Sequence, residues 1–135
     1  MRRLPTRRWR PSLFICAPLI PRDPLAACAF LPQVVADLRV TVTNVGQVPG
    51  SEVVQLYVAY PPAAGEPPLV LRAFAKTGDL APQASRTVSL ELSRRDLSVW
   101  ATTTAGGGWQ PVRGAFELHV GSSSRDLRLH HAAQF

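Results

Sequence analysis

The sequence predicts an all-β protein, a β-sandwich of seven or eight short antiparallel strands over residues 33–130. Apolar residues recur there with period two, turn-forming residues recur about every ten positions, and no segment shows the apolar spacing of a long helix. Residues 1–32 differ in composition and are expected to form an irregular or disordered leader, and residues 131–135 a tail.

The first half of the predicted domain contains four strands. From Leu38 to Thr43 apolar and polar residues alternate, up to a turn at Asn44-Val45-Gly46. The segment Val53–Tyr60 is apolar on both parities except at Gln55, which predicts a strand covered on both sides, and Pro61-Pro62 ends it. Two further strands are predicted, Leu69–Lys76 and the alternating segment Thr87–Leu92. A turn over 79–84 is expected between them.

The second half continues with short strands and turns. Ser93-Arg94-Arg95-Asp96 has the spacing of a capping box and predicts one helical turn. The strands expected after it are Leu97–Thr104, Trp109–Val112, Phe116–Val120 and a last one around Leu127 and Leu129, with turns at Gly106–Gly108 and Gly121–Ser124. Over about 100 residues this pattern is typical of an immunoglobulin-like or fibronectin type III-like sandwich.

The positive charge of the chain belongs to the leader rather than to the predicted domain. The chain carries a formal charge of +6, and residues 1–32 hold six arginines against one acid, which is +5. The remaining residues hold nine basic against eight acidic side chains, which is +1. We therefore expect no nucleic-acid partner, and no apolar run reaches the roughly 20 residues of a membrane span.

The leader has several interpretations. Arginines precede the apolar run Leu13–Ile20, and Ala27-Cys28-Ala29 has the small-x-small pattern of a signal-peptidase site, although Pro18 and Pro21 break the run. The Arg-rich, acid-poor composition also fits an organellar transit peptide, and the interleaved Trp9 fits a basic nucleic-acid arm. A disordered segment, or an artefact of where the gene model begins, is the interpretation that requires no function.

The predicted domain offers no catalytic centre and no cofactor or metal site. General acid–base chemistry needs two converging carboxylates, whereas the eight acids here are spread one per strand or turn. His119 falls on the outward parity of its strand, and His130 and His131 near the chain end are expected to be solvated. Trp100 and Trp109 flank a glycine turn and are the candidate carbohydrate contacts; the alternative is a cross-strand pair that closes the hairpin into the core.

Four blocks of sequence resemble the fibronectin type III-like C-terminal domain of family 3 glycoside hydrolases, the β-glucosidases and their β-xylosidase relatives. The blocks follow one another in the family's order over about residues 37–129. They are Val40-Thr41-Val42-Thr43-Asn44-x-Gly46-x-x-x-Gly50-x-Glu52-Val53-Val54-Gln55-Leu56-Tyr57-Val58, Leu71-Arg72-x-Phe74-x-Lys76, Ser93-Arg94-Arg95-Asp96-Leu97-Ser98-x-Trp100, and Trp109 with Gly114-x-Phe116-Glu117-Leu118-x-Val120-Gly121-x-Ser123-Ser124-Arg125-Asp126-Leu127.

The resemblance implies an accessory role in a secreted, extracellular β-glucosidase that takes part in polysaccharide (cellulose) breakdown. In that family a barrel domain carries an Asp nucleophile, and a Glu acid/base often lies in the following domain; nothing in this chain matches either segment. We therefore expect no catalytic residue and no cofactor, and the implied partner is the catalytic part of the enzyme, normally in the same chain. The chain is then a fragment; the alternative is a free-standing module that binds carbohydrate or protein.

One departure from the family affects a turn. Where the family commonly has Pro-Gly-Glu, this chain has Pro82-Gln83-Ala84. Because the glycine is lost, we expect the turn to be strained or reshaped.

Overall fold

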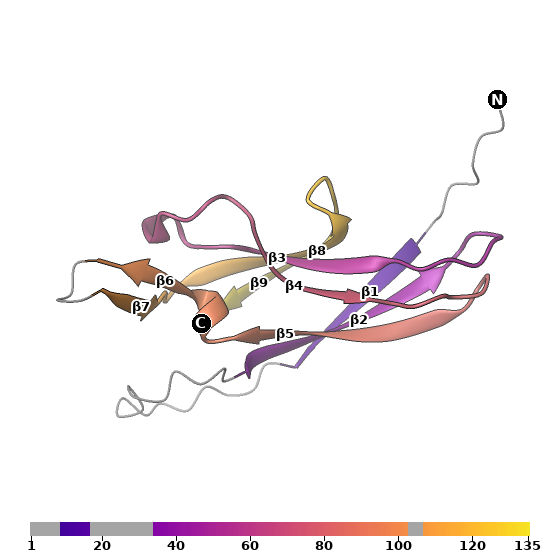
Figure 1. Cartoon of the computed structure of the whole chain (residues 1–135), viewed down its shortest axis with the longest axis horizontal. Coiled ribbons are helices and arrows are strands. Elements are labelled where there is room, and N and C mark those ends of the chain that lie inside the picture. The colour runs from indigo at the N-terminus through magenta and orange to yellow at the C-terminus, as the bar shows by residue number, and fades with distance from the viewer. Residues whose placement is uncertain (1–8, 17–33, 103–106) are drawn as a thin grey trace.

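The computed structural model of the chain describes residues 9–16, 34–102 and 107–135, and it confirms the β-sandwich (Figure 1). One sheet has the strand order β1-β2-β5, the other has the order β4-β3-β8-β9, and the hairpin β6-β7 projects at one end. All the paired strands are antiparallel. The strands are β1 (Trp9–Cys16), β2 (Val34–Asn44), β3 (Val53–Ala59), β4 (Val70–Lys76), β5 (Ser85–Ser93), β6 (Ser98–Ala101), β7 (Gly108–Pro111), β8 (Ala115–Ser123) and β9 (Asp126–Gln134).

The period-two pattern of the sequence fills the space between the sheets. Because alternate residues of a strand point to opposite faces, one parity of each central strand forms the core. The largest fully buried apolar side chains are Phe116, Leu38, Leu56, Leu90, Leu92, Leu118, Val40, Val58 and Val120. Burying each of them contributes roughly 1.5–3 kcal/mol, so a domain without disulfide bonds in its core depends on this packing.

The outer faces of the two sheets differ in chemistry. On the β2–β5 pair, hydroxyls bond across the strands, with 2.7 Å between Thr41 Oγ1 and Thr87 Oγ1 and 2.7 Å between Thr43 Oγ1 and Ser85 Oγ. On the other sheet Tyr57 is buried although it lies on the outer parity of β3, and its neighbours on that parity are only partly buried. The prediction that β3 is covered on both sides therefore holds only in part.

Asn44 ties the two loops at one end of the sandwich. Its side chain is buried; Nδ2 donates to the carbonyl oxygens of Val48 (2.8 Å) and Leu80 (3.0 Å), and Oδ1 accepts from the amide of Gly46 at 2.9 Å. Both Nδ2 hydrogens and the Oδ1 oxygen thus have partners, which is what burial of an amide requires.

The helical turn predicted after β5 is present as the one-turn 3-10 helix η2 (Arg95–Leu97). Ser93 and Asp96 bond to each other in both directions: Asp96 Oδ2 accepts from the amide (2.8 Å) and hydroxyl (2.6 Å) of Ser93, and Ser93 Oγ accepts from the Asp96 amide at 3.4 Å. A second such turn, η1 (Pro62–Ala64), follows β3. In the described ranges no helix is longer than one turn, so none has the length needed to cross a membrane.

The structure departs from the sequence prediction at both ends of the chain. Residues 9–16, expected to belong to an irregular leader, form β1, which pairs with β2 and supplies hydrogen-bond partners for an edge that would otherwise be open. The segment expected to be a tail continues β9 to Gln134, and the backbone of Phe135 pairs with that of Gly114. The Phe135 ring packs edge-to-face on Phe116 at 5.5 Å, which gives this end a place in the core.

Some predicted features lie outside the described residues. They are the signal-like Ala27-Cys28-Ala29, the end of the predicted strand Leu97–Thr104 beyond residue 102, and Gly106 of the glycine turn. The boundary at residue 33 stays a prediction.

Candidate functional site

The two tryptophans singled out from the sequence form a cross-strand pair at the projecting hairpin. Trp100 of β6 lies opposite Trp109 of β7, and their rings meet edge-to-face at 5.7 Å and 82°. The Arg95 guanidinium lies 4.9 Å from the centroid of the Trp109 ring, a distance typical of a cation–π contact. The pair is therefore present as expected, but it does not enter the core, because Trp100 is 55 % exposed.

The geometry of the pair leaves one ring available to a ligand. Perpendicular rings cannot form a flat platform of two indoles, so the exposed ring of Trp100 is the one that could stack on a sugar. Gly107 makes this placement possible: it has a φ of 69°, and a Cβ there would come within 2.8 Å of Trp100 Cζ2. A larger residue at this position would displace the indole.

An apolar edge, formed by Leu71 and Phe74 of β4, is the most exposed hydrophobic surface of the second sheet. Phe74 is 70 % exposed and Leu71 is 46 % exposed. Leu71 lies opposite Tyr57 and Phe74 lies opposite Gln55, so both side chains share the outer face. We call this pair the β4 apolar edge.

A hydrogen-bonded cluster anchors the β4 apolar edge to the rest of the domain. The Tyr60 hydroxyl donates to the backbone carbonyl of Asp96 and accepts from Arg72 Nε (2.8 Å) and Nη2 (2.5 Å). Burial raises the pKa of Tyr60, an effect that Arg72 opposes. The Tyr60 ring meets Phe116 of the core at 5.4 Å, so strands β3 and β4 and helix η2 are held together at one point.

The carboxylate of Asp126 is tied to a neighbouring cation. Asp126 accepts hydrogen bonds from Arg128 Nη2 at 2.5 Å and from Ser122 Oγ at 2.7 Å. The bond from Arg128, followed by that from Ser122, lowers the pKa of Asp126 to about 2. A general acid needs a raised pKa instead, so this carboxylate is suited to holding the β8–β9 turn and not to proton transfer.

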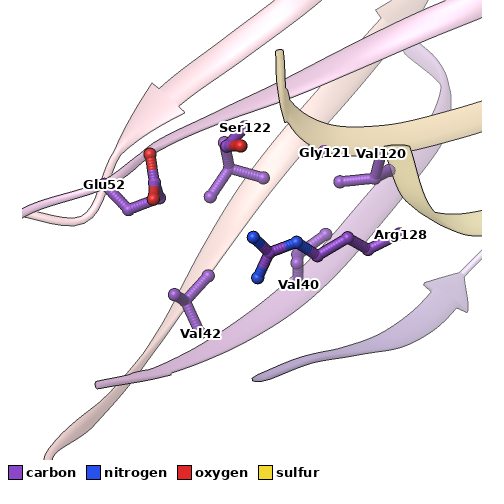
Figure 2. A pocket seen from close by; sticks show the side chains of 8 residues that line it. Val40, Val42, Glu52, Val120, Gly121, Ser122 and Arg128 are labelled. Atoms are coloured by element: carbon purple, nitrogen blue, oxygen red, sulfur yellow. The ribbon is translucent and has the colours of Figure 1, made fainter. Parts of the chain in front are cut away.

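A small pocket opens between the sheets beside this turn. Val40, Val42 and Val54 line its apolar part, and Glu52 and Arg128 lie at its polar side. Figure 2 shows the Arg128 side chain reaching across the pocket towards Glu52 and Val42. The Glu52 carboxylate accepts from the amide of Val53 at 3.0 Å, which is a structural contact at the start of β3.

Two of the three histidines are brought together on the outer face of the second sheet. His119 of β8 lies opposite His130 of β9, and their Nδ1 atoms are 2.6 Å apart. His131 lies opposite the buried Leu118 and so has the other parity. No group of three histidine, cysteine, aspartate or glutamate side chains suited to a metal occurs within residues 34–102 and 107–135.

Sequence reasoning missed the β4 apolar edge and the Tyr60 cluster. The signal for the first was Leu71-Arg72-x-Phe74, in which two large apolar residues stand three apart in a strand. The signal for the Tyr60 cluster was Arg72, which lies between those two apolar residues and needs a hydrogen-bond acceptor. Neither signal indicates its face without the register of the sheet.

Comparison with known proteins identifies the domain. Residues 52–124 match the family described as fibronectin type III-like domain. The chain is 49 % identical over 100 residues to β-glucosidase cel3A of Pyricularia oryzae, and the match covers 72 % of this chain and 13 % of the relative. It is 50 % identical over 95 residues to probable β-glucosidase G of Aspergillus flavus, and this match covers 69 % of this chain and 11 % of the relative.

Solved structures give the same result. The β-D-glucoside glucohydrolase of Trichoderma reesei superposes with a TM-score of 0.76 at 37 % identity, over 95 % of this chain and 19 % of that chain. A glycoside hydrolase family 3 β-glucosidase of Neurospora crassa superposes with a TM-score of 0.67 at 33 % identity, over 76 % and 12 % respectively. The chain thus spans about an eighth of the curated relatives it matches. It belongs to the fibronectin type III-like domain family, in the form found in β-glucosidases of glycoside hydrolase family 3.

Proposed function

We propose that this domain is a non-catalytic accessory domain of a secreted family 3 β-glucosidase that serves polysaccharide (cellulose) breakdown. The observation that carries the proposal is the match to a segment that makes up only 11–13 % of relatives whose names are those of β-glucosidases. In this proposal hydrolysis belongs to the rest of such an enzyme, and the sandwich supports it by packing against it.

The β4 apolar edge is the surface proposed to contact the catalytic part. Exposed apolar area of this kind marks interaction sites on soluble domains, and Phe74 has most of its ring in water. The occupant is the remainder of the β-glucosidase, because that is what accompanies this segment in its relatives. The anchoring of Arg72 by Tyr60 fixes the strand that carries the edge, which lowers the entropic cost of docking.

The outer face of the first sheet is a poorer candidate. Its hydroxyls already bond to one another, at Thr41–Thr87 and Thr43–Ser85. A partner placed on the β2–β5 part of this face would gain little apolar burial, since it meets hydroxyl and charged side chains there.

A chimera tests the proposal. The matching segment of Pyricularia oryzae cel3A is replaced by that of this chain, and hydrolysis of an aryl β-glucoside and thermal inactivation are measured. We expect an active chimera in which Phe74→Ser lowers stability by about 1–2 kcal/mol, because the buried ring is lost. In the chain by itself the same change should fall within about 0.5 kcal/mol, as is usual for an exposed site.

The matched control is Val48→Ser, which removes a similarly exposed apolar residue, 42 % exposed, from a loop. Equal effects of Phe74→Ser and Val48→Ser in the chimera would contradict docking through β4. Turnover of the aryl glucoside by the purified chain, above that of a tag-only control, would contradict the non-catalytic role.

The exposure of Trp100 supports a second candidate function, a free-standing module that binds carbohydrate. Sugar rings stack on exposed indoles, and Trp100 is 55 % exposed. The assay is a pull-down on cellulose. Trp100→Ala should abolish retention while Trp109→Ala, which removes the supporting ring, weakens it; retention unchanged by Trp100→Ala excludes this function.

A further inference from the structure

The histidine pair on the outer face has a geometry that neither a core nor a docking role explains. His119 and His130 come from adjacent strands, β8 and β9, and are directly opposite in register. Their ring centroids are 4.8 Å apart with the ring planes at 83°, and Nδ1 of one faces Nδ1 of the other at 2.6 Å. At that separation one nitrogen must be protonated and the other must offer its lone pair.

A neighbouring carboxylate decides which nitrogen accepts. Glu117 Oε2 lies 3.3 Å from His119 Nε2, and an ionised carboxylate can only accept a hydrogen bond. This contact favours the tautomer in which Nε2 of His119 carries the proton and Nδ1 holds the lone pair directed at His130. A carboxylate that orients a histidine through one nitrogen while the other is free to bind is the arrangement found around protein-bound metals.

We infer that His119 and His130 form a two-nitrogen binding site for a divalent transition-metal ion of the Cu²⁺, Ni²⁺ or Zn²⁺ class. In the metal-bound form the ring proton of His130 resides on Nε2, so both Nδ1 atoms present lone pairs to the ion. Metal–nitrogen bonds of about 2.0–2.1 Å place two adjacent ligand atoms about 2.9–3.4 Å apart at angles of 90–110°. The pair therefore needs to open by less than about 1 Å, which rotation of the exposed His130 side chain provides.

The surroundings suit a surface site with open coordination positions. The His119 side chain is 14 % exposed and held by Glu117, whereas His130 is exposed, so one ligand is fixed and the other can adjust. His131 lies on the opposite parity and is not a third ligand. Water completes the coordination, and imidazole ligands favour Cu²⁺ over Ni²⁺ and Zn²⁺, with Mn²⁺ weakest.

Metal titration of the full chain tests the inference. The binding of CuCl₂, NiCl₂ and ZnCl₂ is followed by calorimetry, in a chain without a histidine tag and with Cys16→Ser and Cys28→Ser to remove thiol ligands. We expect one ion per chain, affinities in the order just given, and a Cu²⁺ electron paramagnetic resonance spectrum with coupling to two nitrogens. The metal concentration is raised to about 100 µM, roughly ten times the protein concentration. If no binding is detected at that concentration, the proposed site is overturned.

Histidine variants locate it. His119→Gln and His130→Gln should each weaken binding more than about tenfold, and Glu117→Gln by about tenfold through loss of orientation. The matched control His131→Gln should leave affinity unchanged. Binding that survives His130→Gln, or that falls equally in His131→Gln, overturns the assignment. Unchanged thermal unfolding of the metal-free variants shows that any loss is one of ligation.

Discussion

The turn at Gln83 allows the free-energy cost of a left-handed backbone conformation to be measured. Gln83 has a φ of 63°, which is the left-handed region, and it is the only residue other than glycine with positive φ within the described ranges. It follows Pro82 in a turn closed by a 3.0 Å bond from the Ala84 amide to the Ala81 carbonyl. A turn of this kind favours glycine at the third position, where the side chain of any other residue is crowded.

The change Gln83→Gly should stabilise the domain. Holding a residue with a Cβ in the left-handed region costs about 1–2 kcal/mol, and the added freedom of glycine in the unfolded chain offsets about 0.4–1 kcal/mol of the relief. The net gain is roughly 0.5–1 kcal/mol, or a rise of about 2–8 °C in Tm for a domain of this size. The amide of Gln83, which donates to the Asn44 carbonyl at 2.7 Å, keeps its bond in the glycine variant.

Thermal and urea unfolding of the chain provide the measurement. The matched control is Gln47→Gly, at an exposed loop residue with negative φ, which should lose about 0.5 kcal/mol because only the entropic term remains. Gln83→Asn should lie between wild type and Gln83→Gly, since asparagine tolerates this region better. If Gln83→Gly is no more stable than wild type, the turn does not store the strain inferred from its φ.

Three further substitutions or conditions probe packing and charge. Gly121→Ala should destabilise the domain by at least about 3 kcal/mol in urea unfolding, because a Cβ would lie 2.0 Å from the backbone oxygen of Asp126; a loss below 1 kcal/mol would contradict that close approach. Tyr60→Phe should cost about 1.5–3 kcal/mol by removing the acceptor of Arg72, and an unchanged midpoint would mean that the arginine finds another partner. The pKa of Asp126 is lowered to about 2, so its pairing with Arg128 contributes stability above about pH 4 that is lost as the pH falls through about 2. For this exposed pair the loss is at most about 1 kcal/mol, and the stability gap between wild type and Asp126→Asn should narrow from pH 5 to pH 2.5.

The core could be predicted from the sequence because period-two alternation reports burial directly. Val88, Leu90 and Leu92 alternate with polar residues and all three are buried, as expected. The capping spacing of Ser93 and Asp96 also produced the expected single turn. These signals are local, so they need no knowledge of which strands pair.

The β4 apolar edge could not be predicted because it depends on a β-bulge. Leu71 and Phe74 are three residues apart, and strict alternation would place them on opposite faces. The register of β4 against β3 shifts between Leu56 and Tyr57, and this shift brings both residues to the outer face. A bulge of this kind is set by pairing between strands and has no clear sequence mark.

Strand β1 and the continuation of β9 past Leu129 were not predicted, for a similar reason. An edge strand such as β9 needs only a few inward residues, here Leu129 and Ala133, and its polar members resemble a solvated tail. The pairing that places His130 beside His119 depends on this strand. Without this pairing, the sequence predicts no metal ligands among the histidines.

The fastening of two loops by Asn44 has a consequence for motion. Its side chain bonds to Val48 and Leu80, and its backbone amide and carbonyl bond to Ala84 and Gln83. Neither loop can therefore open without breaking bonds to the other, and the amides of Asn44, Leu80 and Gln83 should exchange their hydrogens at one common rate. This end of the sandwich then behaves as one cooperative unit of local unfolding.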